Sequence, residues 1–165
     1  MGSGTILREV IAAADLLRED WKVNADIWSA TSFNELRRDG MSAERHNLLH
    51  PTKARRKSYI ESALEGHAGP VIAATDYMRN YADQVRSHIP RRYVTLGTDG
   101  FGFSDTRPAA RRYYNTDGES IAVAVLEGLA RDGNIDQSVA VDAANKYQID
   151  DVLAAPEQTS DPGVA

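Results

Sequence analysis

The chain has 165 residues, 42% of them hydrophobic and 26% charged, which is the length and composition of a single globular domain. Its formal net charge of −5 argues against nucleic acid as the main partner, because that binding depends on Lys and Arg neutralising phosphates. The lack of cysteine excludes disulfides, thiol nucleophiles and cysteine-ligated zinc, and fits a cytoplasmic protein. The sequence has no apolar run of about 18 residues, so we expect no membrane partner.

Hydrophobic periodicity and turn residues predict alternating helices and strands up to residue 96. The predicted elements are a helix over 6–20, a strand over 24–31, a helix that starts with the capping box at 32–35 and stops before 51, a polar basic loop over 52–57, a short helix over 58–64, a strand over 71–74, a helix over 77–89 and a strand over 93–96. This alternation predicts an α/β fold in three layers, with a mostly parallel sheet flanked by helices and right-handed crossovers.

The chain after residue 107 reads as helical. Residues 116–119 form a second capping box ahead of an apolar stripe that ends near Gly133, and a further helix is expected to start near Asp136. The last ten residues, 156–165, are polar and contain proline, so we expect a disordered tail there and a domain over 1–155.

The strongest candidate for a functional loop is the glycine-rich segment 97–107, which joins the strand at 93–96 to the next helix. Its candidate residues are Asp99, Gly100, Phe101, Gly102, Phe103, Ser104, Asp105 and Arg107. In open α/β sheets, ligands and partners bind at the carboxyl ends of the strands. Gly100 and Gly102 are expected to adopt conformations that tolerate no β-carbon. The alternative is a tight strand-to-helix connection that binds nothing.

Charged and aromatic residues in and after this loop suggest two further roles. Asp99 and Asp105 can form an acid and base pair, although such aspartates more often hold a turn through bonds to the backbone. Phe101 and Phe103 are expected to dock on a neighbouring element or a partner chain. A subunit contact is expected from Tyr113 and Tyr114 together with Arg111 and Arg112, because Tyr and Arg are enriched in interface hot spots. The alternative is that one tyrosine packs in the core.

Weaker candidates have simpler structural interpretations. They are His46 and His50 as metal ligands, His67 and His88 as surface or packing residues, Gly2, Ser3 and Gly4 with Asp26 as a nucleotide site, and Lys53, Arg55, Arg56 and Lys57 as a surface for an acidic partner. Helix-end histidines that bond the last carbonyls are the simpler interpretation of His46 and His50, and a solvated loop is the simpler interpretation of the basic residues. No catalytic, cofactor-binding or metal-binding residue is therefore assigned in this chain.

Six motifs follow one another in a recognisable order. They are GSGTILREV at 2–10, ATSFNELRRDG at 30–40, NLLHP at 47–51, ATDYMRNYADQVRSHIP at 74–90, GTDGFGFSDTR at 97–107 and RRYYNTD at 111–117. Together they resemble the C-terminal domain of the homodimeric pyruvate dehydrogenase component of the pyruvate dehydrogenase complex. The GSG opening and the GFGFS loop are more distantly similar to the C-terminal domain of transketolases.

The resemblance implies a transketolase C-terminal-like fold and a role as a structural and dimerisation domain. The parent reaction would be pyruvate decarboxylation on thiamine diphosphate and magnesium, followed by acetylation of lipoyl groups. The implied partners are the remaining domains of the parent enzyme, a second copy of the chain, and the dihydrolipoyl acetyltransferase component. In that family a strand precedes the GSG turn, so we expect the first strand to be missing here and the chain to be inactive alone. The alternative function is an independent domain that binds an anionic metabolite at the glycine-rich loop.

Overall fold

The computed structural model describes residues 1–156. Its elements are the helices α1 (Leu7–Trp21), α2 (Phe33–Leu49), α3 (Tyr59–Ala63), α4 (Arg79–Asp83), α5 (Arg107–Tyr113), α6 (Gly118–Arg131) and α7 (Gln137–Tyr147), the strands β1 (Val71–Ala74) and β2 (Tyr93–Leu96), and the 3₁₀ turns η1 (Gly4–Ile6), η2 (Arg86–His88) and η3 (Val152–Ala154). Within 1–156, no helix is long and apolar enough to cross a membrane. The expected tail lies outside the described residues, apart from residue 156.

Four helices start at a residue whose side chain caps the first turn: α2, α3, α6 and α7. The Ser32 hydroxyl accepts a hydrogen bond from the Glu35 amide at 3.2 Å, which starts α2, and Ser58 starts α3 by the same contact. Asp136 caps α7 as expected. At α6 the cap is Asp117 and not Thr116, because its carboxylate accepts from the Ser120 amide at 3.0 Å. These local signals therefore give the helix starts correctly to within one residue.

The sheet is parallel but narrow. β1 and β2 pair in register from Val71 with Tyr93 to Ala74 with Leu96. On the other side of β1, Gly2 makes single parallel bridges to Ala74 and to Ser29. The strand predicted over 24–31 is therefore wrong, since only Ser29 in it has a bridge. The physical reason is that a strand needs a paired neighbour, and residues 1–3 pair with only the far end of this segment.

The predicted helix over 77–89 is also wrong in its extent, because it is broken into α4 and η2. Two tertiary contacts compete with a regular helix here. The Asp83 carboxylate accepts from the Thr95 hydroxyl at 3.0 Å. The Arg86 guanidinium donates to the Tyr93 carbonyl at 2.7 Å and so ties η2 to β2.

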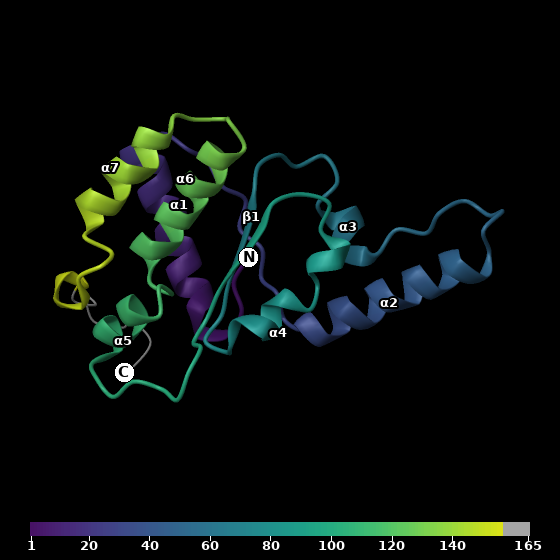
Figure 1. Cartoon of the computed structure of the whole chain (residues 1–165), viewed down its shortest axis with the longest axis horizontal. Coiled ribbons are helices and arrows are strands. Elements are labelled where there is room, and N and C mark those ends of the chain that lie inside the picture. Colours follow the sequence, from purple (N-terminus) through teal and green to yellow (C-terminus); the bar gives the residue numbers. More distant parts are fainter. Residues whose placement is uncertain (157–165) are drawn as a thin grey trace, which may run out of the picture.

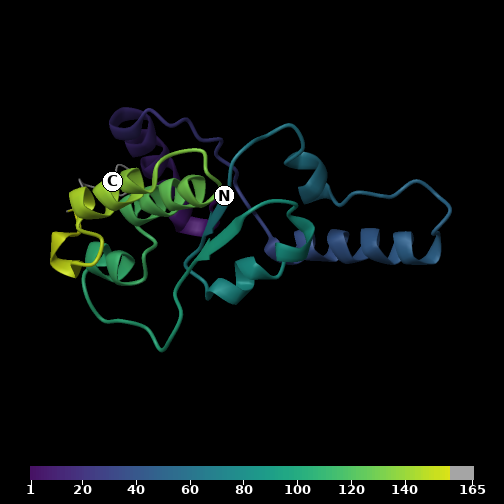
Figure 2. The same ribbon diagram turned by 45° about the horizontal axis from the view of Figure 1, so that its top comes forward.

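Two layers of helices cover the two faces of the sheet (Figure 1). On one face α1, α6 and α7 form a hydrophobic cluster with the buried residues Val10, Leu17, Ile121, Leu126 and Tyr147. On the other face α2, α3 and α4 form a second cluster around Phe33, Ile60, Leu64, Val85 and Ile89. This is the expected three-layer arrangement, with fewer strands at its centre. Figure 2 shows α2 and the loop after it projecting away from the rest of the molecule.

Candidate functional site

The glycine-rich loop follows the carboxyl end of β2 and leads into α5 (Figure 1). Gly100 has φ of 108° and Gly102 has φ of 98°, both in a region that L side chains rarely adopt. A β-carbon at either glycine would meet no described atom within 4 Å. The backbone angle, and not crowding, is therefore what requires glycine here. The loop lies where the sequence predicts it.

The two aspartates of the loop are engaged in holding the backbone. Asp99 accepts from the Arg79 backbone amide and from the Arg79 guanidinium, each at 2.9 Å. These two bonds, the backbone one first, lower the pKa of the Asp99 carboxyl below its ordinary value. Asp105 accepts from the Thr106 amide at 2.7 Å. A carboxylate with a lowered pKa remains ionised near neutral pH, which makes Asp99 a poor general acid.

Four aromatic residues of the loop and of the end of α5 are called here the aromatic cluster: Phe101, Phe103, Tyr113 and Tyr114, of which the first three are exposed. The Phe103 and Tyr113 rings are stacked, with centroids 4.4 Å apart and an interplanar angle of 9°. Tyr114 meets Tyr113 edge to face at 5.0 Å. Phe101 is fully exposed, and Tyr113 is 54% exposed. Phe103 therefore docks on a neighbouring element, whereas Phe101 presents its whole ring to solvent.

The arginines beside the tyrosines point inward, which corrects the expectation that they join a subunit contact. Arg111 pairs with Glu9 of α1 at 2.6 Å, and the other Glu9 oxygen accepts from the Gly118 amide at 3.0 Å. Arg112 is buried and pairs with Asp117 at 3.2 Å and with Glu119. Burial raises the pKa of the Glu119 carboxyl, and the Arg112 charge acts in the opposite direction.

Arg112 also fixes the end of α7. Its Nη1 donates to the Tyr147 carbonyl at 2.9 Å and to the Gln148 carbonyl at 3.0 Å. Both carbonyls belong to the last turn of α7 or to its cap, where carbonyls lack partners within the helix. The two arginines thus attach α5 to three other helices, so Tyr113 and Tyr114 lie on a well-anchored helix end.

Only some of these ion pairs can be predicted from the sequence. Asp117 and Glu119 lie five and seven residues after Arg112, so a local pairing is readable. Glu9 is 102 residues from Arg111, and no local pattern connects them. The residues missed as site residues are therefore Glu9, Asp117 and Glu119.

The weaker candidates have internal partners. The His46 and His50 ring centroids are 4.7 Å apart, but within the described chain no group of three His, Asp or Glu side chains could hold a metal ion. His67 contacts Asp26 at 2.8 Å, and the buried His88 ring contacts Glu44 at 3.4 Å. His46 and His50 are thus a poor metal site, and the Asp26 carboxylate points toward His67.

The basic loop and the opening glycines have internal partners as well. Arg55 pairs with Glu61 at 2.6 Å, Arg56 with Asp39 at 3.2 Å, and Lys57 with Glu65. At the opening turn, the Thr5 hydroxyl donates to Asp76 at 3.0 Å, and the Asp76 carboxylate lies next to Gly4. An anion approaching this turn would meet a carboxylate, which disfavours a nucleotide phosphate there.

Comparison with known proteins identifies the relatives of this chain. The family model "Transketolase-like TK C-terminal domain" matches residues 1–117. The whole chain is 57% identical over 165 residues to the pyruvate dehydrogenase E1 component of Mycolicibacterium smegmatis, and 163 residues are 56% identical to that of Mycobacterium tuberculosis. The Escherichia coli K12 protein of the same name is 46% identical over 151 residues. The chain spans 18% of the length of the two mycobacterial relatives.

Proposed function

Because the chain belongs to the family of transketolase-like C-terminal domains, we propose that it serves as a structural and subunit-contact domain of a pyruvate dehydrogenase E1 enzyme. The parent reaction would be oxidative decarboxylation of pyruvate with acetylation of lipoyl groups, in the cytoplasm. Identity of 57% along the whole chain supports this assignment. On this proposal the chain alone has no turnover.

The observation that supports the contact role is the exposure of aromatic rings in the aromatic cluster, next to the anchored helix α5. Exposed Phe101 and the half-exposed ring of Tyr113 would be stabilised by burial against another surface, since apolar area in water is unfavourable. Arg111 and Arg112 hold α5 in place, so little conformational entropy is lost at Tyr113 when a partner binds. The partners on this proposal are the remaining domains of the enzyme and a second copy of the chain in a homodimer. The dihydrolipoyl acetyltransferase component would be reached through the complete enzyme.

Thiamine diphosphate and magnesium fit this chain poorly. Magnesium that carries a diphosphate is commonly held by one or two carboxylates together with the phosphate oxygens. The two carboxylates of the glycine-rich loop, Asp99 and Asp105, are instead bonded to backbone amides of this chain. We therefore place both cofactors in other domains of the proposed enzyme, and no catalytic step is assigned to this chain.

Calorimetry tests the absence of turnover. Thiamine diphosphate is titrated with magnesium into the purified chain, and pyruvate decarboxylation is measured in parallel. A full-length pyruvate dehydrogenase E1 serves as the positive control. We expect no heat of binding and no activity from the chain. Magnesium-dependent binding in the micromolar range would contradict the proposal.

Light scattering tests the contact role. We expect a dimer or larger species at micromolar concentration, and the double substitution Phe101→Ser and Phe103→Ser should weaken association at least tenfold. Leu48→Ser is the matched control, because Leu48 is exposed but lies at the far end of α2. Equal weakening by both variants, or a stable monomer at about 100 μM, would show that the aromatic cluster is not the contact.

The alternative, an anionic metabolite at the glycine-rich loop, has less support. The loop carries two carboxylates, and α5 has only seven residues. A thermal-shift screen of anionic metabolites separates the two functions, because a ligand at 100 times its Kd stabilises by about 2.7 kcal/mol. A rise in melting temperature with one metabolite, abolished by the substitution Arg107→Gln, would favour the metabolite-binding function.

A further inference from the structure

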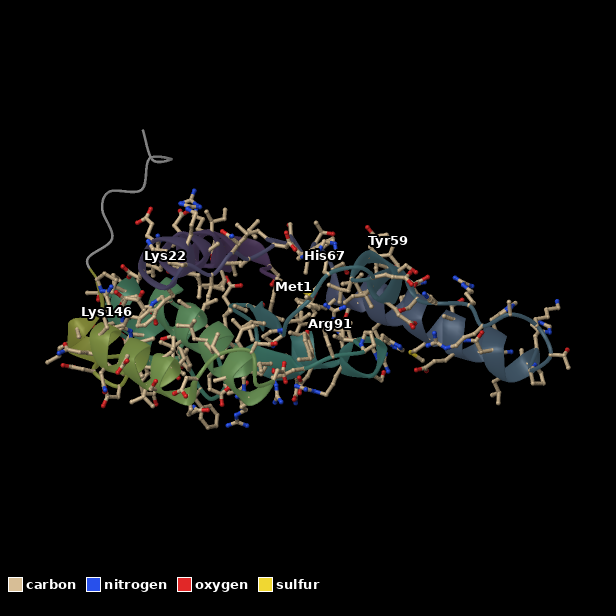
Figure 3. The ribbon with its side chains drawn as sticks, turned by 90° about the horizontal axis from the view of Figure 1, so that it is seen from above. Met1, Lys22, Tyr59, His67, Arg91 and Lys146 are labelled. Atoms are coloured by element: carbon tan, nitrogen blue, oxygen red, sulfur yellow. The ribbon has the colours of Figure 1, made fainter. Side chains whose placement is uncertain are left out.

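The helix α2 and the loop that follows it, residues 33–57, project from the body of the molecule and are called here the arm. In Figure 3 the outer half of α2 extends past the labelled Tyr59, and among residues 1–156 only the loop of the arm lies alongside it. The arm has seven Lys and Arg but three Asp and Glu, so it is positively charged in a chain whose formal net charge is −5. It shares no residue with the glycine-rich loop or the aromatic cluster and is therefore independent of the proposed function.

Two sides of α2 are covered by the chain itself. Gly40 and Ala43 are buried on the side that faces the body of the molecule. On a second side, the Arg56 guanidinium of the loop donates to the Asp39 carboxylate at 3.2 Å. The Asn47 side chain accepts from the Arg56 amide at 2.8 Å and donates to the Arg56 carbonyl at 2.9 Å. These contacts fix the loop and leave the remaining side of α2 open to solvent.

The open side of α2 carries a regular pattern of charged and apolar side chains, called here the stripe: Arg38, Met41, Arg45 and Leu48. These residues follow one another at steps of three, four and three, so they share one face of the helix. All four are exposed, Met41 to 47% and Leu48 to 79%. The two arginines are seven residues apart, and so are the two apolar residues. A repeat of seven is typical of a helix that packs lengthwise against another helix.

The guanidinium groups of the stripe are not committed to strong contacts within the chain. Arg38 pairs with Glu35 at 2.7 Å, but the Arg38 side chain is 74% exposed, and surface pairs of this kind contribute little to stability. Arg45 makes no ion pair with any residue in the described range 1–156. Carboxylates of a partner could therefore bind both guanidinium groups in place of water, without breaking a buried contact.

The mixture of charge and apolar surface selects the kind of partner. Two stripes from two copies of the chain would place arginine opposite arginine in a parallel pair, and arginine opposite Met41 or Leu48 in an antiparallel pair. Neither arrangement supplies a carboxylate to a guanidinium that leaves water, which is costly. Nucleic acid would neutralise the arginines with phosphates but would give the two apolar side chains no apolar contact. A membrane surface favours a broad apolar face, whereas this stripe alternates apolar and charged residues.

We propose that the stripe is a docking surface for an acidic amphipathic helix of a partner protein. Carboxylates of that helix lie opposite Arg38 and Arg45, and its apolar side chains lie against Met41 and Leu48. The stripe spans about 15 Å at about 1.5 Å per residue, which is about three helical turns. A contact of this length is small, so the complex is transient, with an affinity in the micromolar range.

A helical peptide of about 21 residues, long enough to form a helix in water, serves as the probe. It carries Glu and Leu in alternation at steps of three and four residues, with Ala and Gln elsewhere. One control peptide has Lys at every Glu position, and a second has Ser at every Leu position. In fluorescence anisotropy we expect saturable binding of the acidic peptide to the full chain, and binding weaker by about tenfold or more for each control. Equal binding of the acidic and the lysine peptide would overturn the proposal.

Charge reversal on the stripe gives a sharper measurement. Arg45→Glu should weaken binding of the acidic peptide by about tenfold or more and should strengthen binding of the lysine peptide. A gain of binding cannot result from unfolding, so this variant is informative even if it is less stable. Arg131→Glu is the matched control, because Arg131 is exposed on α6 and the change in net charge is the same. Equal effects of the two substitutions would show that only overall charge attracts the peptide, and the proposal would be wrong.

Anionic vesicles distinguish an acidic helix from a membrane surface. The full chain is sedimented with vesicles of equal parts phosphatidylglycerol and phosphatidylcholine. We expect no sedimentation that depends on Arg45. Vesicle binding that Arg45→Glu abolishes, together with no binding of the acidic peptide, would assign the stripe to a membrane surface and refute the helix.

Discussion

Replacing Arg112 with methionine should be among the most damaging single changes in the described fold. The side chain is completely buried and serves four partners: the carboxylates of Asp117 and Glu119 and the carbonyls of Tyr147 and Gln148. Methionine fills similar space but removes every donor. Two carboxylates would then face each other without a cation, and two helix-end carbonyls would lose a partner.

The cost follows from the burial of these groups. Removing one partner of a buried ion pair typically costs about 3–5 kcal/mol, and we expect Arg112→Met to fall in that range. Asp117 retains bonds from Ser120, at 3.0 Å from its amide and 2.7 Å from its hydroxyl, which limits the loss. For a domain of this size, the melting temperature should fall by roughly 6–20 °C at about 2–4 °C per kcal/mol.

The assay is urea unfolding followed by tryptophan fluorescence, since the chain has two tryptophans. Arg131→Met is the control, because Arg131 pairs with Glu127 but is 63% exposed, and such a change should cost less than about 1 kcal/mol. Adding Glu119→Gln to Arg112→Met should recover part of the loss. If Arg112→Met lowers the free energy of unfolding no more than Arg131→Met does, the ion pairs and hydrogen bonds of Arg112 do not stabilise the fold.

The pH dependence of this variant has a definite sign. Burial already raises the pKa of Glu119, and loss of the opposing Arg112 charge should raise it further. The native state then binds a proton that the unfolded state releases, so stability is greatest at low pH and falls as the pH rises through the folded pKa. The deficit of Arg112→Met relative to the unsubstituted chain should therefore be smaller at pH 5 than at pH 8.

Two further predictions concern the glycine-rich loop and the amino terminus. Gly102→Val should lower the free energy of unfolding by more than about 1 kcal/mol, because φ is 98° at this position. Urea unfolding measures this change, with Ser104→Val as the control. Equal unfolding midpoints for the two variants would show that position 102 tolerates a β-carbon. Burial lowers the pKa of the Met1 amine from its ordinary value of 8.0 to about 6 in the folded chain. Between these two pH values the unfolded state binds more protons than the folded state. The free energy of unfolding should therefore rise by up to about 2–3 kcal/mol from pH 6 to pH 8. An N-terminally acetylated chain should lack this increment, and identical pH profiles for the two forms would rule out a buried amine.

Features that depend on a few neighbouring residues could be predicted from the sequence. The Ser32 and Ser58 caps act over three residues, and both helices begin where the pattern indicates. The requirement for glycine at positions 100 and 102 is equally local, because it concerns one backbone angle at each. The position of the loop at the end of β2 follows from the order of the elements.

Features that depend on distant residues could not be predicted. Residues 24–31 have the composition of a strand, but strand pairing requires a neighbour, which here is present only at Gly2. The pattern RRYY favours an exposed contact surface, and only the fold brings Glu9 to Arg111. Tyr113 is half-exposed, whereas Arg112 is buried and Arg111 is turned toward α1.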